Sequence, residues 1–236
     1  MVEMSKMKSF AHAAVMSAFV LIFSGSARGA ETKSTAMPFP VASVHLEQNA
    51  TDEDMEVVFE VKGGQDGLAE LSVVSPDGRP VVAFRAPDAS TLGIREFRFE
   101  SPEPRDIKSL NAAYPEGVYE FSGKMSSGAT LVGKSTLSHR LPATTTFVKP
   151  APETENVAVK ELGISWSAVE GVASYVVSIK QKELQVHMTA LLPGSSTSFA
   201  VPPGFLLPGR KYQMTIGTVT HEGNISYVET TFTTEK

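Results

Sequence analysis

The chain of 236 residues contains no cysteine. It therefore has no disulfide bond, no cysteine nucleophile and no cysteine-ligated zinc site. Exported domains often need disulfides to compensate for a small hydrophobic core, but two domains of about 100 residues each can fold without them.

Basic runs and aromatic residues are also scarce. The net charge is −5 at pH 7, with 21 lysine and arginine residues against 26 aspartate and glutamate residues. An acidic chain without a basic patch is repelled by the phosphate backbone, so we expect no nucleic-acid partner. The single tryptophan is Trp166. Few aromatic side chains therefore remain for the exposed platform that a carbohydrate-binding module would need.

The only long apolar run lies at residues 10–23. Lysines precede it and small residues follow it, as in a secretory signal peptide, and it is too short for a comfortable bilayer span. We predict a signal peptide at residues 1–30, cleaved after Gly29, Ala27 or Ala30; the alternative is an uncleaved N-terminal anchor. A leader on a cysteine-free chain favours an exported bacterial protein, periplasmic or extracellular, with no transmembrane span after cleavage.

Residues 31–39 form a short polar lead that we expect to be flexible. Residues 40–141 then predict an N-terminal β-sandwich. Short segments alternate apolar and polar residues with the period of a strand, as at Val57, Phe59 and Val61. Turn sequences separate these segments, and seven or eight strands at this spacing are typical of a sandwich.

Local features add detail to this domain. Residues 75–78 (Ser-Pro-Asp-Gly) predict a type I turn that joins two strands as a hairpin. Phe97 and Phe99 are expected to face the core, and Asp106 is placed to cap one helical turn. The proline-rich junction at residues 142–155 predicts a semi-rigid connector, part of which is a candidate first strand of the next domain.

Residues 156–236 predict a second β-sandwich. Ile164, Trp166 and Ala168 share one face of an extended segment, and Tyr175 begins another alternating segment. Tyr212 follows Leu-Pro-Gly at the start of a strand, where its hydroxyl can bind the preceding corner as in a tyrosine corner. These parts, in this order and spacing, resemble fibronectin type III domains, and the resemblance implies a seven-stranded sandwich used for adhesion, spacing or partner binding. Another immunoglobulin-like sandwich is the alternative.

Three further pieces broaden the resemblance: residues 96–104, 114–123 and 131–139. With them, the whole chain resembles exported bacterial proteins of unknown function that carry a C-terminal fibronectin type III domain. The resemblance implies the fold class, all-β with two sandwiches in tandem after a signal peptide. It implies no catalytic residues and no cofactor.

The sequence offers little catalytic chemistry. The histidines after the leader (His45, His139, His187 and His221) are not spaced as metal ligands. No Gly-x-Ser-x-Gly elbow is present, although a Ser-His-Asp arrangement assembled across the fold stays open. The glycine-rich residues 63–67 precede no helix that would complete a phosphate loop, so we interpret them as a hairpin turn.

Two acidic groups are candidate calcium or catalytic carboxylates, and two Asn-x-Ser/Thr sequences are glycosylation acceptors only in a host that glycosylates such sites. Residues 52–54 (Asp52, Glu53, Asp54) could bind calcium weakly, although such a run is usually a solvated turn. Glu96 and Glu100 lie about 13 Å apart along one strand, too far for a paired acid and base, and with nearby Glu103 they indicate an exposed charged face. Asn49 and Asn224 are expected to be turn residues in a bacterium.

These observations predict a non-enzymatic interaction or scaffold protein that binds a protein partner in the cell envelope. Candidate surfaces are the loop at residues 221–224 and the turn at residues 202–205, where Phe205 either faces solvent or folds back on the core. The alternatives are a carbohydrate-binding accessory module at the cell wall and an enzyme with a deep polar pocket. The sequence does not identify the partner, the binding face or the oligomeric state.

Overall fold

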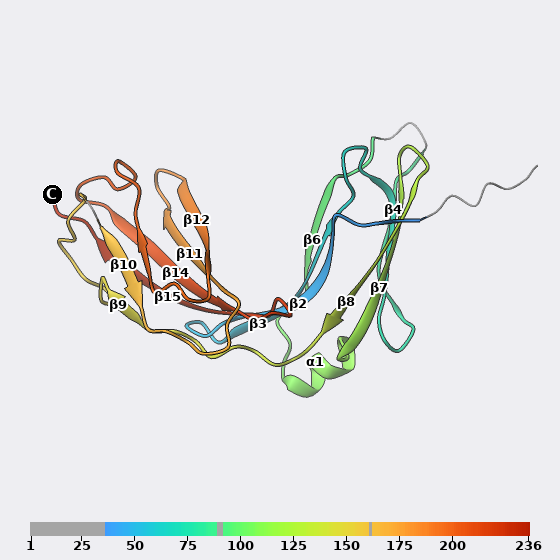
Figure 1. The fold of residues 1–236 in the computed structure, drawn as a ribbon, viewed down its shortest axis with the longest axis horizontal. Coiled ribbons are helices and arrows are strands. Elements are labelled where there is room, and N and C mark those ends of the chain that lie inside the picture. Colours follow the sequence, from blue (N-terminus) through green and yellow to red (C-terminus); the bar gives the residue numbers. More distant parts are fainter. Residues whose placement is uncertain (1–35, 89–91, 161) are drawn as a thin grey trace, which may run out of the picture. The chain divides into compact units, whose positions relative to one another are not determined.

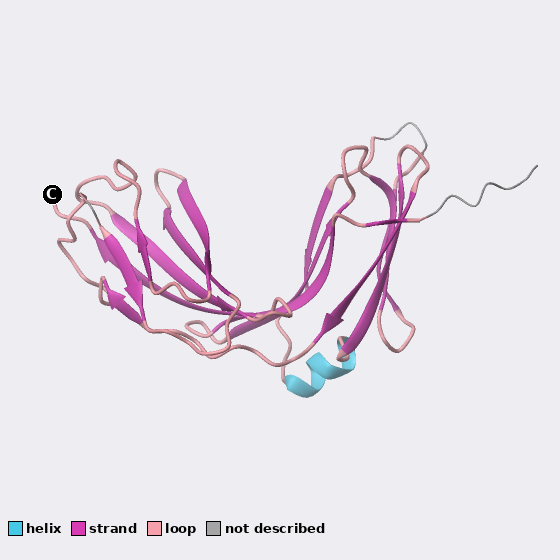
Figure 2. Cartoon of the chain, in the orientation of Figure 1, coloured by secondary structure: helices cyan, strands magenta, loops and turns pink. Residues whose placement is uncertain are grey.

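The computed structural model describes residues 36–88, 92–160 and 162–236. The predicted signal peptide lies outside these residues and stays a prediction. The described part is almost entirely β, with a single short helix, α1 (Ile107–Ala113) (Figure 2). Its sheets enclose two hydrophobic clusters, which confirms the predicted fold class, all-β with packed β-sandwiches. None of the helical structure described is long and apolar enough to cross a membrane.

The first half of the described chain forms an N-terminal sandwich. One layer is a five-stranded sheet in the order β1-β8-β7-β4-β5, and the facing layer contains β2, β3 and β6. The strands are β1 (Met37–Pro38), β2 (Val41–Asn49), β3 (Asp54–Lys62), β4 (Leu68–Val74), β5 (Pro80–Arg85), β6 (Glu96–Glu100), β7 (Gly117–Met125) and β8 (Thr130–Leu137).

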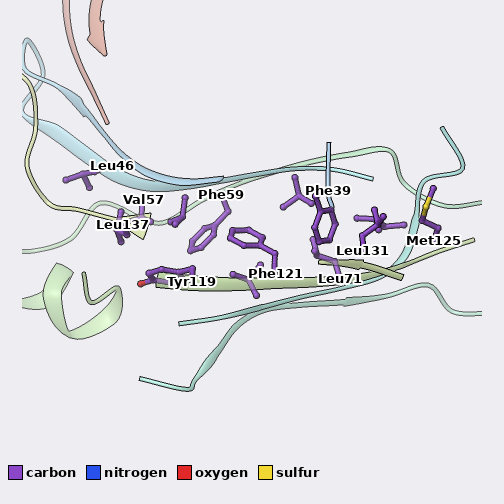
Figure 3. Packing of buried hydrophobic residues seen from close by; sticks show 14 of the residues in the cluster. Phe39, Leu46, Val57, Phe59, Leu71, Tyr119, Phe121, Met125, Leu131 and Leu137 are labelled. Atoms are coloured by element: carbon purple, nitrogen blue, oxygen red, sulfur yellow. The ribbon is translucent and has the colours of Figure 1, made fainter. Parts of the chain in front are cut away.

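The core of the N-terminal sandwich forms where the inward residues of the two layers meet (Figure 3). Phe59 packs edge-on against Tyr119, with ring centroids 5.8 Å apart. Phe97 and Phe99 pack against this cluster, as their alternation predicts. The turn at residues 75–78 joins β4 and β5 as the predicted hairpin, with the Gly78 amide donating to the Ser75 carbonyl.

Two predictions for the N-terminal sandwich concern the cap of α1 and the segment that leads into β2. The Asp106 carboxylate accepts a hydrogen bond from the Ser109 amide at 2.6 Å, so the predicted N-cap is confirmed. The expectation of a flexible lead at residues 31–39 is wrong for its last residues. Met37–Pro38 pairs in parallel with β8, and the Phe39 side chain is buried in the core.

The second half forms a C-terminal sandwich with the seven-stranded arrangement expected of a fibronectin type III-like fold. Three strands, in the order β13-β10-β9, face four strands in the order β12-β11-β14-β15. The strands are β9 (Phe147–Lys149), β10 (Gly163–Trp166), β11 (Ser174–Gln181), β12 (Val186–Pro193), β13 (Ser198–Ala200), β14 (Lys211–Val219) and β15 (Ile225–Thr233). The proline-rich junction supplies β9, as one interpretation of the sequence proposed.

Trp166 and two tyrosines fill this core, as the sequence predicts. The Trp166 and Tyr175 rings lie 5.4 Å apart, and both side chains are almost fully buried. The Tyr212 hydroxyl accepts a hydrogen bond from the Leu207 amide at 2.8 Å, which confirms the tyrosine corner. Phe205 packs toward the same core, 6.3 Å from the Tyr212 ring, rather than facing solvent.

The two sandwiches share one sheet. The first residues of β15 pair in parallel with the last residues of β2, with Ile225 opposite Glu47 and Tyr227 opposite Asn49. The pairing joins four strands of one sandwich to three of the other, in the order β12-β11-β14-β15-β2-β3-β6. Figure 1 shows β2 beside β15. The sequence predicts two sandwiches linked by a connector, and this backbone ladder adds a second link.

Candidate functional site

The seven-stranded sheet has one side that faces away from both cores. Because residues that pair across neighbouring strands point to the same side, the registers define this side from β12 to β6. We call it the outer sheet face. It carries His187, Thr189 and Leu191 of β12, Val176, Ser178 and Lys180 of β11, Gln213, Thr215 and Gly217 of β14, Tyr227, Glu229 and Thr231 of β15, His45 and Glu47 of β2, Glu56, Val58 and Glu60 of β3, and Arg98 and Glu100 of β6.

Arg98 lies at the centre of a charge network on this face. Its guanidinium donates to Glu100 at 2.7 Å and to Glu60 at 2.9 Å. It also donates to both carboxylate oxygens of Glu47 at 3.1 Å. The planar fork of arginine suits such shared carboxylate binding. Three carboxylates from β2, β3 and β6 are thereby fixed around one cation.

Glu47 is the buried member of the network. His45 Nε2 lies 2.8 Å from its carboxylate. Burial acts to raise the pKa of the Glu47 carboxyl, but the hydrogen bond with His45 and the charge of Arg98 outweigh burial and hold the pKa below its ordinary value. Burial lowers the pKa of Arg98, but Glu100, Glu47 and Glu60 raise it by more. Both groups therefore stay charged.

The opposite shift occurs directly across the ladder from Glu47. Glu56 pairs with Glu47 in the β2–β3 register. Its pKa is raised by burial and then by the negative charges of Glu100, Glu47 and Asp54. Burial, followed by the Glu47 charge, also raises the pKa of the nearby Tyr227 hydroxyl. The part of the outer sheet face on β2, β3 and β6 is thus an acidic region in which the pKa of Glu47 is lowered and that of Glu56 is raised.

Asn224 ties this region to the rest of the chain. Its side-chain oxygen accepts from the Leu46 amide at 2.9 Å, and its amide nitrogen donates to the carbonyls of Ser138 and Arg140. The Ser226 hydroxyl donates to the Pro142 carbonyl at 2.8 Å. The interpretation of Asn224 as an ordinary turn residue is therefore wrong. It is a buried link, 2% exposed, between β15, β2 and the segment after β8.

The other end of the outer sheet face is basic. Lys180, Gln213 and Thr231, together with flanking Lys182, Glu183 and Lys211, line an open hollow of about 460 Å³. The face therefore carries lysines on β11 and β14, towards its β12 edge, and carboxylates around Arg98 on β2, β3 and β6, towards its other edge. This layout presents two charges of opposite sign to any molecule that covers the face.

A serine and a histidine also meet on the outer sheet face. His187 Nε2 lies 2.9 Å from the Ser178 hydroxyl and 3.0 Å from the Thr189 hydroxyl. A nucleophilic triad needs a carboxylate that orients the histidine and amides that bind the oxyanion. Within the described residues no carboxylate hydrogen-bonds His187, so the pair lacks the orienting group of a triad.

His139 and His221 do not form a shared site in the described part of the chain. His139 Nε2 lies 2.8 Å from the Tyr114 carbonyl, and His221 is exposed in the loop before β15. Among the residues that the structure describes, no group of three or more His, Asp or Glu residues is arranged to hold a metal ion. Of the possible calcium ligands, Asp52 and Glu53 lie in the turn between β2 and β3, where Asp52 accepts a hydrogen bond from Asn49, and Asp54 is the first residue of β3.

Glu96 and Glu100 lie on an exposed charged face, as the sequence predicts: Glu96 pairs with Lys62, and Arg98 binds Glu47, Glu60 and Glu100. The structure changes two other interpretations. Residues 63–67 do not close a hairpin, because β3 and β4 belong to different sheets and residues 63–67 cross between them. In the candidate loop at residues 221–224, Asn224 is buried, and only His221 and Glu222 are exposed.

Sequence reasoning missed the outer sheet face because it missed one strand and one pairing. Residues 186–193 alternate four inward and four outward residues, a signal that identifies β12. The pairing of β15 with β2 joins residues 178 positions apart and leaves no local pattern.

Comparisons with known proteins find sandwiches of the same general kind. A scan of protein-family models and a search of curated proteins both return no match. Among solved structures, the fibronectin(III)-like modules of Clostridium thermocellum CbhA align over 83% of this chain and 91% of theirs, with 11% identity and a TM-score of 0.34.

Two chicken structures align similarly. A two-domain fibronectin type III segment of tenascin covers 82% of this chain and 98% of its own, with 16% identity and a TM-score of 0.31. The FN1–FN3 domains of CNTN1 cover 85% and 65%, with 11% identity and a TM-score of 0.35. Superpositions at these scores carry no argument about function.

Proposed function

We propose that the chain is a non-enzymatic interaction or scaffold protein that binds another protein through the outer sheet face. The observation that supports this most is the sheet itself, which runs without a break through both sandwiches and carries mainly polar and charged residues on its outer side, many of them at least partly exposed. A surface of this extent, built on strands, holds its side chains in fixed positions. The proposed location is the cell envelope of a bacterium, which rests on the leader predicted at residues 1–30.

The charge layout favours a protein as the partner. Lysines at one end of the face and carboxylates around Arg98 provide complementary contacts for a partner with the reverse arrangement. Such complementarity speeds encounter and fixes orientation. A carbohydrate platform would instead need exposed aromatic rings, and the large hydrophobic side chains exposed in the described part are aliphatic or methionine.

The proposal of a non-catalytic role rests on the chemistry of the same face. Among the residues that the structure describes, Ser178 and His187 form a nucleophile-like pair on it, but no carboxylate hydrogen-bonds His187 to orient it as a triad requires. The hydrogen bond with His45 and the charge of Arg98 hold the pKa of the buried Glu47 below its ordinary value, so the carboxyl is not poised to exchange a proton near neutral pH. In this proposal the Glu47 carboxylate holds Arg98 in position and does not act as a general acid or base.

Co-purification tests the proposal. The chain, with a C-terminal tag, is expressed in its native host, lightly crosslinked and purified, and captured proteins are identified by mass spectrometry. Lys180→Glu reverses a charge on the outer sheet face, whereas Lys124→Glu makes the same change on the exposed side of β7. We expect one reproducible envelope protein that the Lys180 variant loses and the Lys124 variant retains.

Loss of the captured protein in both variants, or in neither, would contradict the assignment of the binding face. Surface substitutions are preferable to deleting residues 40–141, because that deletion removes β2 and opens a new edge on β15. A captured set that consists only of background proteins would contradict the proposal as a whole.

A further inference from the structure

The edge strand β12 lacks the features that usually protect an exposed sheet edge, such as charges, bulges and internal prolines. It pairs with β11 over its whole length without a shift in register. In the described part of the chain, no strand lies on its other side (Figure 1). Its eight residues carry no charged side chain, and proline occurs only at the end, as Pro193.

The other edges of the described sheets are shorter or charged. β1, β9 and β13 have only two or three residues each. β5 ends in Arg85 and pairs with β4 through a shift in register. β6 carries the charges of the Arg98 network. Among the described strands, β12 is therefore the long edge that nothing shields from pairing.

The free hydrogen-bonding groups of β12 follow from the ladder with β11. The Gly194 amide donates to the Ala173 carbonyl at 2.9 Å, so the opposed residues Ser174 and Pro193 form a non-hydrogen-bonded pair. Alternation along the ladder then directs the backbone N–H and C=O groups of three residues away from β11. These residues are His187, Thr189 and Leu191.

We propose that β12 pairs with β12 of a second copy of this chain, antiparallel, about a two-fold axis that passes midway between the two Thr189 residues. In this register His187 lies opposite Leu191 of the second copy and Met188 lies opposite its Ala190. The residues that pair have their free backbone groups directed at each other. If the axis instead passed between the two Ala190 residues, His187 would lie opposite Pro193, which has no N–H to donate. The register with Thr189 opposite Thr189 is therefore the better one.

A second copy fits this edge because the strand is complementary to itself. Antiparallel self-pairing sets no like charges opposite each other, and it matches Thr189 with Thr189, a favourable cross-strand pair. Leu191, 71% exposed, gains a neighbour across the interface. The contact is isologous and closes after two copies, so it does not propagate into a fibre.

Dimerisation would join two seven-stranded sheets through their β12 edges. The two outer sheet faces would then lie on one continuous sheet, which allows bivalent binding. The dimer itself does not depend on the proposed function, because the contact needs no other partner.

The absence of cysteine permits a direct test with Thr189→Cys. On the two-fold axis, the hydrogen-bonded pair would set the two Cα atoms about 5.5 Å apart, within the range of a disulfide. The matched control is Val148→Cys, 61% exposed on the edge strand β9. Under mild oxidation we expect a covalent dimer of the Thr189 variant on a non-reducing gel and a monomer of the control. Equal crosslinking of both variants, or none, would overturn the proposal.

Sedimentation equilibrium over a concentration series provides a second test. The unmodified chain should show a monomer–dimer equilibrium. Thr189→Lys would set two like charges opposite each other and raise the dissociation constant at least about fivefold. Val148→Lys adds the same charge elsewhere and should leave the constant unchanged. A chain that stays monomeric at every concentration, or one that Thr189→Lys leaves dimeric, would reject this interface.

Discussion

The Asn224 side chain accepts a hydrogen bond from the Leu46 amide, 178 residues earlier in the chain, at 2.9 Å. The contact lies where β15 meets β2, and it fixes the point at which two sandwiches become one sheet. The proposed binding face depends on this point, because without the pairing the face is divided in two.

Asn224→Ala should therefore destabilise the fold. It leaves the Leu46 amide and the carbonyls of Ser138 and Arg140 without their side-chain partner. We expect a loss of about 2–4 kcal/mol in the free energy of unfolding, because unsatisfied buried groups cost about 1–3 kcal/mol each. Urea unfolding measures it. Asn49→Ala, a change at the partly exposed end of β2, is the control and should cost much less.

Two tyrosine hydroxyls each hydrogen-bond the backbone of a nearby corner, one as an acceptor and the other as a donor. Tyr212 accepts from the Leu207 amide, whereas Tyr119 donates to the Pro115 carbonyl at 3.1 Å. Tyr212→Phe should cost about 1 kcal/mol or more, since it orphans an N–H, and Tyr119→Phe should cost less, since a carbonyl is more easily satisfied. Thermal unfolding of both variants compares them. A larger loss for Tyr119→Phe would contradict this reading of the two corners.

Trp166 combines a large buried ring with an indole N–H that has no hydrogen-bond partner among the described residues. Trp166→Ala should cost about 3–5 kcal/mol through the cavity it leaves. Trp166→Phe retains part of the ring and removes the unpaired N–H, so it should cost less than half as much. Chemical denaturation monitored by circular dichroism tests both. Equal losses would show that ring volume does not determine the stability of this core.

Glu47 and Glu56 should contribute to stability with opposite dependence on pH. The pKa of Glu47 is lowered by folding, so its contribution is present above the ordinary carboxyl pKa and is lost as pH falls through the folded value. The pKa of Glu56 is raised, so folding is favoured when it is protonated and is penalised as pH rises through the folded value.

At neutral pH, Glu47→Gln should therefore lower stability, whereas Glu56→Gln should leave it unchanged or raise it. Unfolding free energies measured from pH 3 to pH 8 should also show a weaker loss at acid pH for the Glu47 variant than for the parent. The account of the Arg98 network fails if both substitutions destabilise the chain equally at neutral pH.

The sequence predicts most of each sandwich, because alternation and turn chemistry are local signals. Trp166, Tyr212 and Asp106 all take the positions that their neighbours predict. The outer sheet face was not predictable in the same way. Glu47 and Arg98 are 51 positions apart in the sequence and lie on different strands, and only the pairing of β2, β3 and β6 brings them together.

Site-specific photo-crosslinking tests the proposed binding face most directly. A photoreactive amino acid replaces Lys180 or Glu56 on the outer sheet face, and Lys124 or Lys134 on the exposed side of the five-stranded sheet. After irradiation in the native host, the first two positions should capture the same protein and the last two should not. Capture from Lys124 and Lys134 alone, or no capture from any position, would contradict the claim that this face binds a protein.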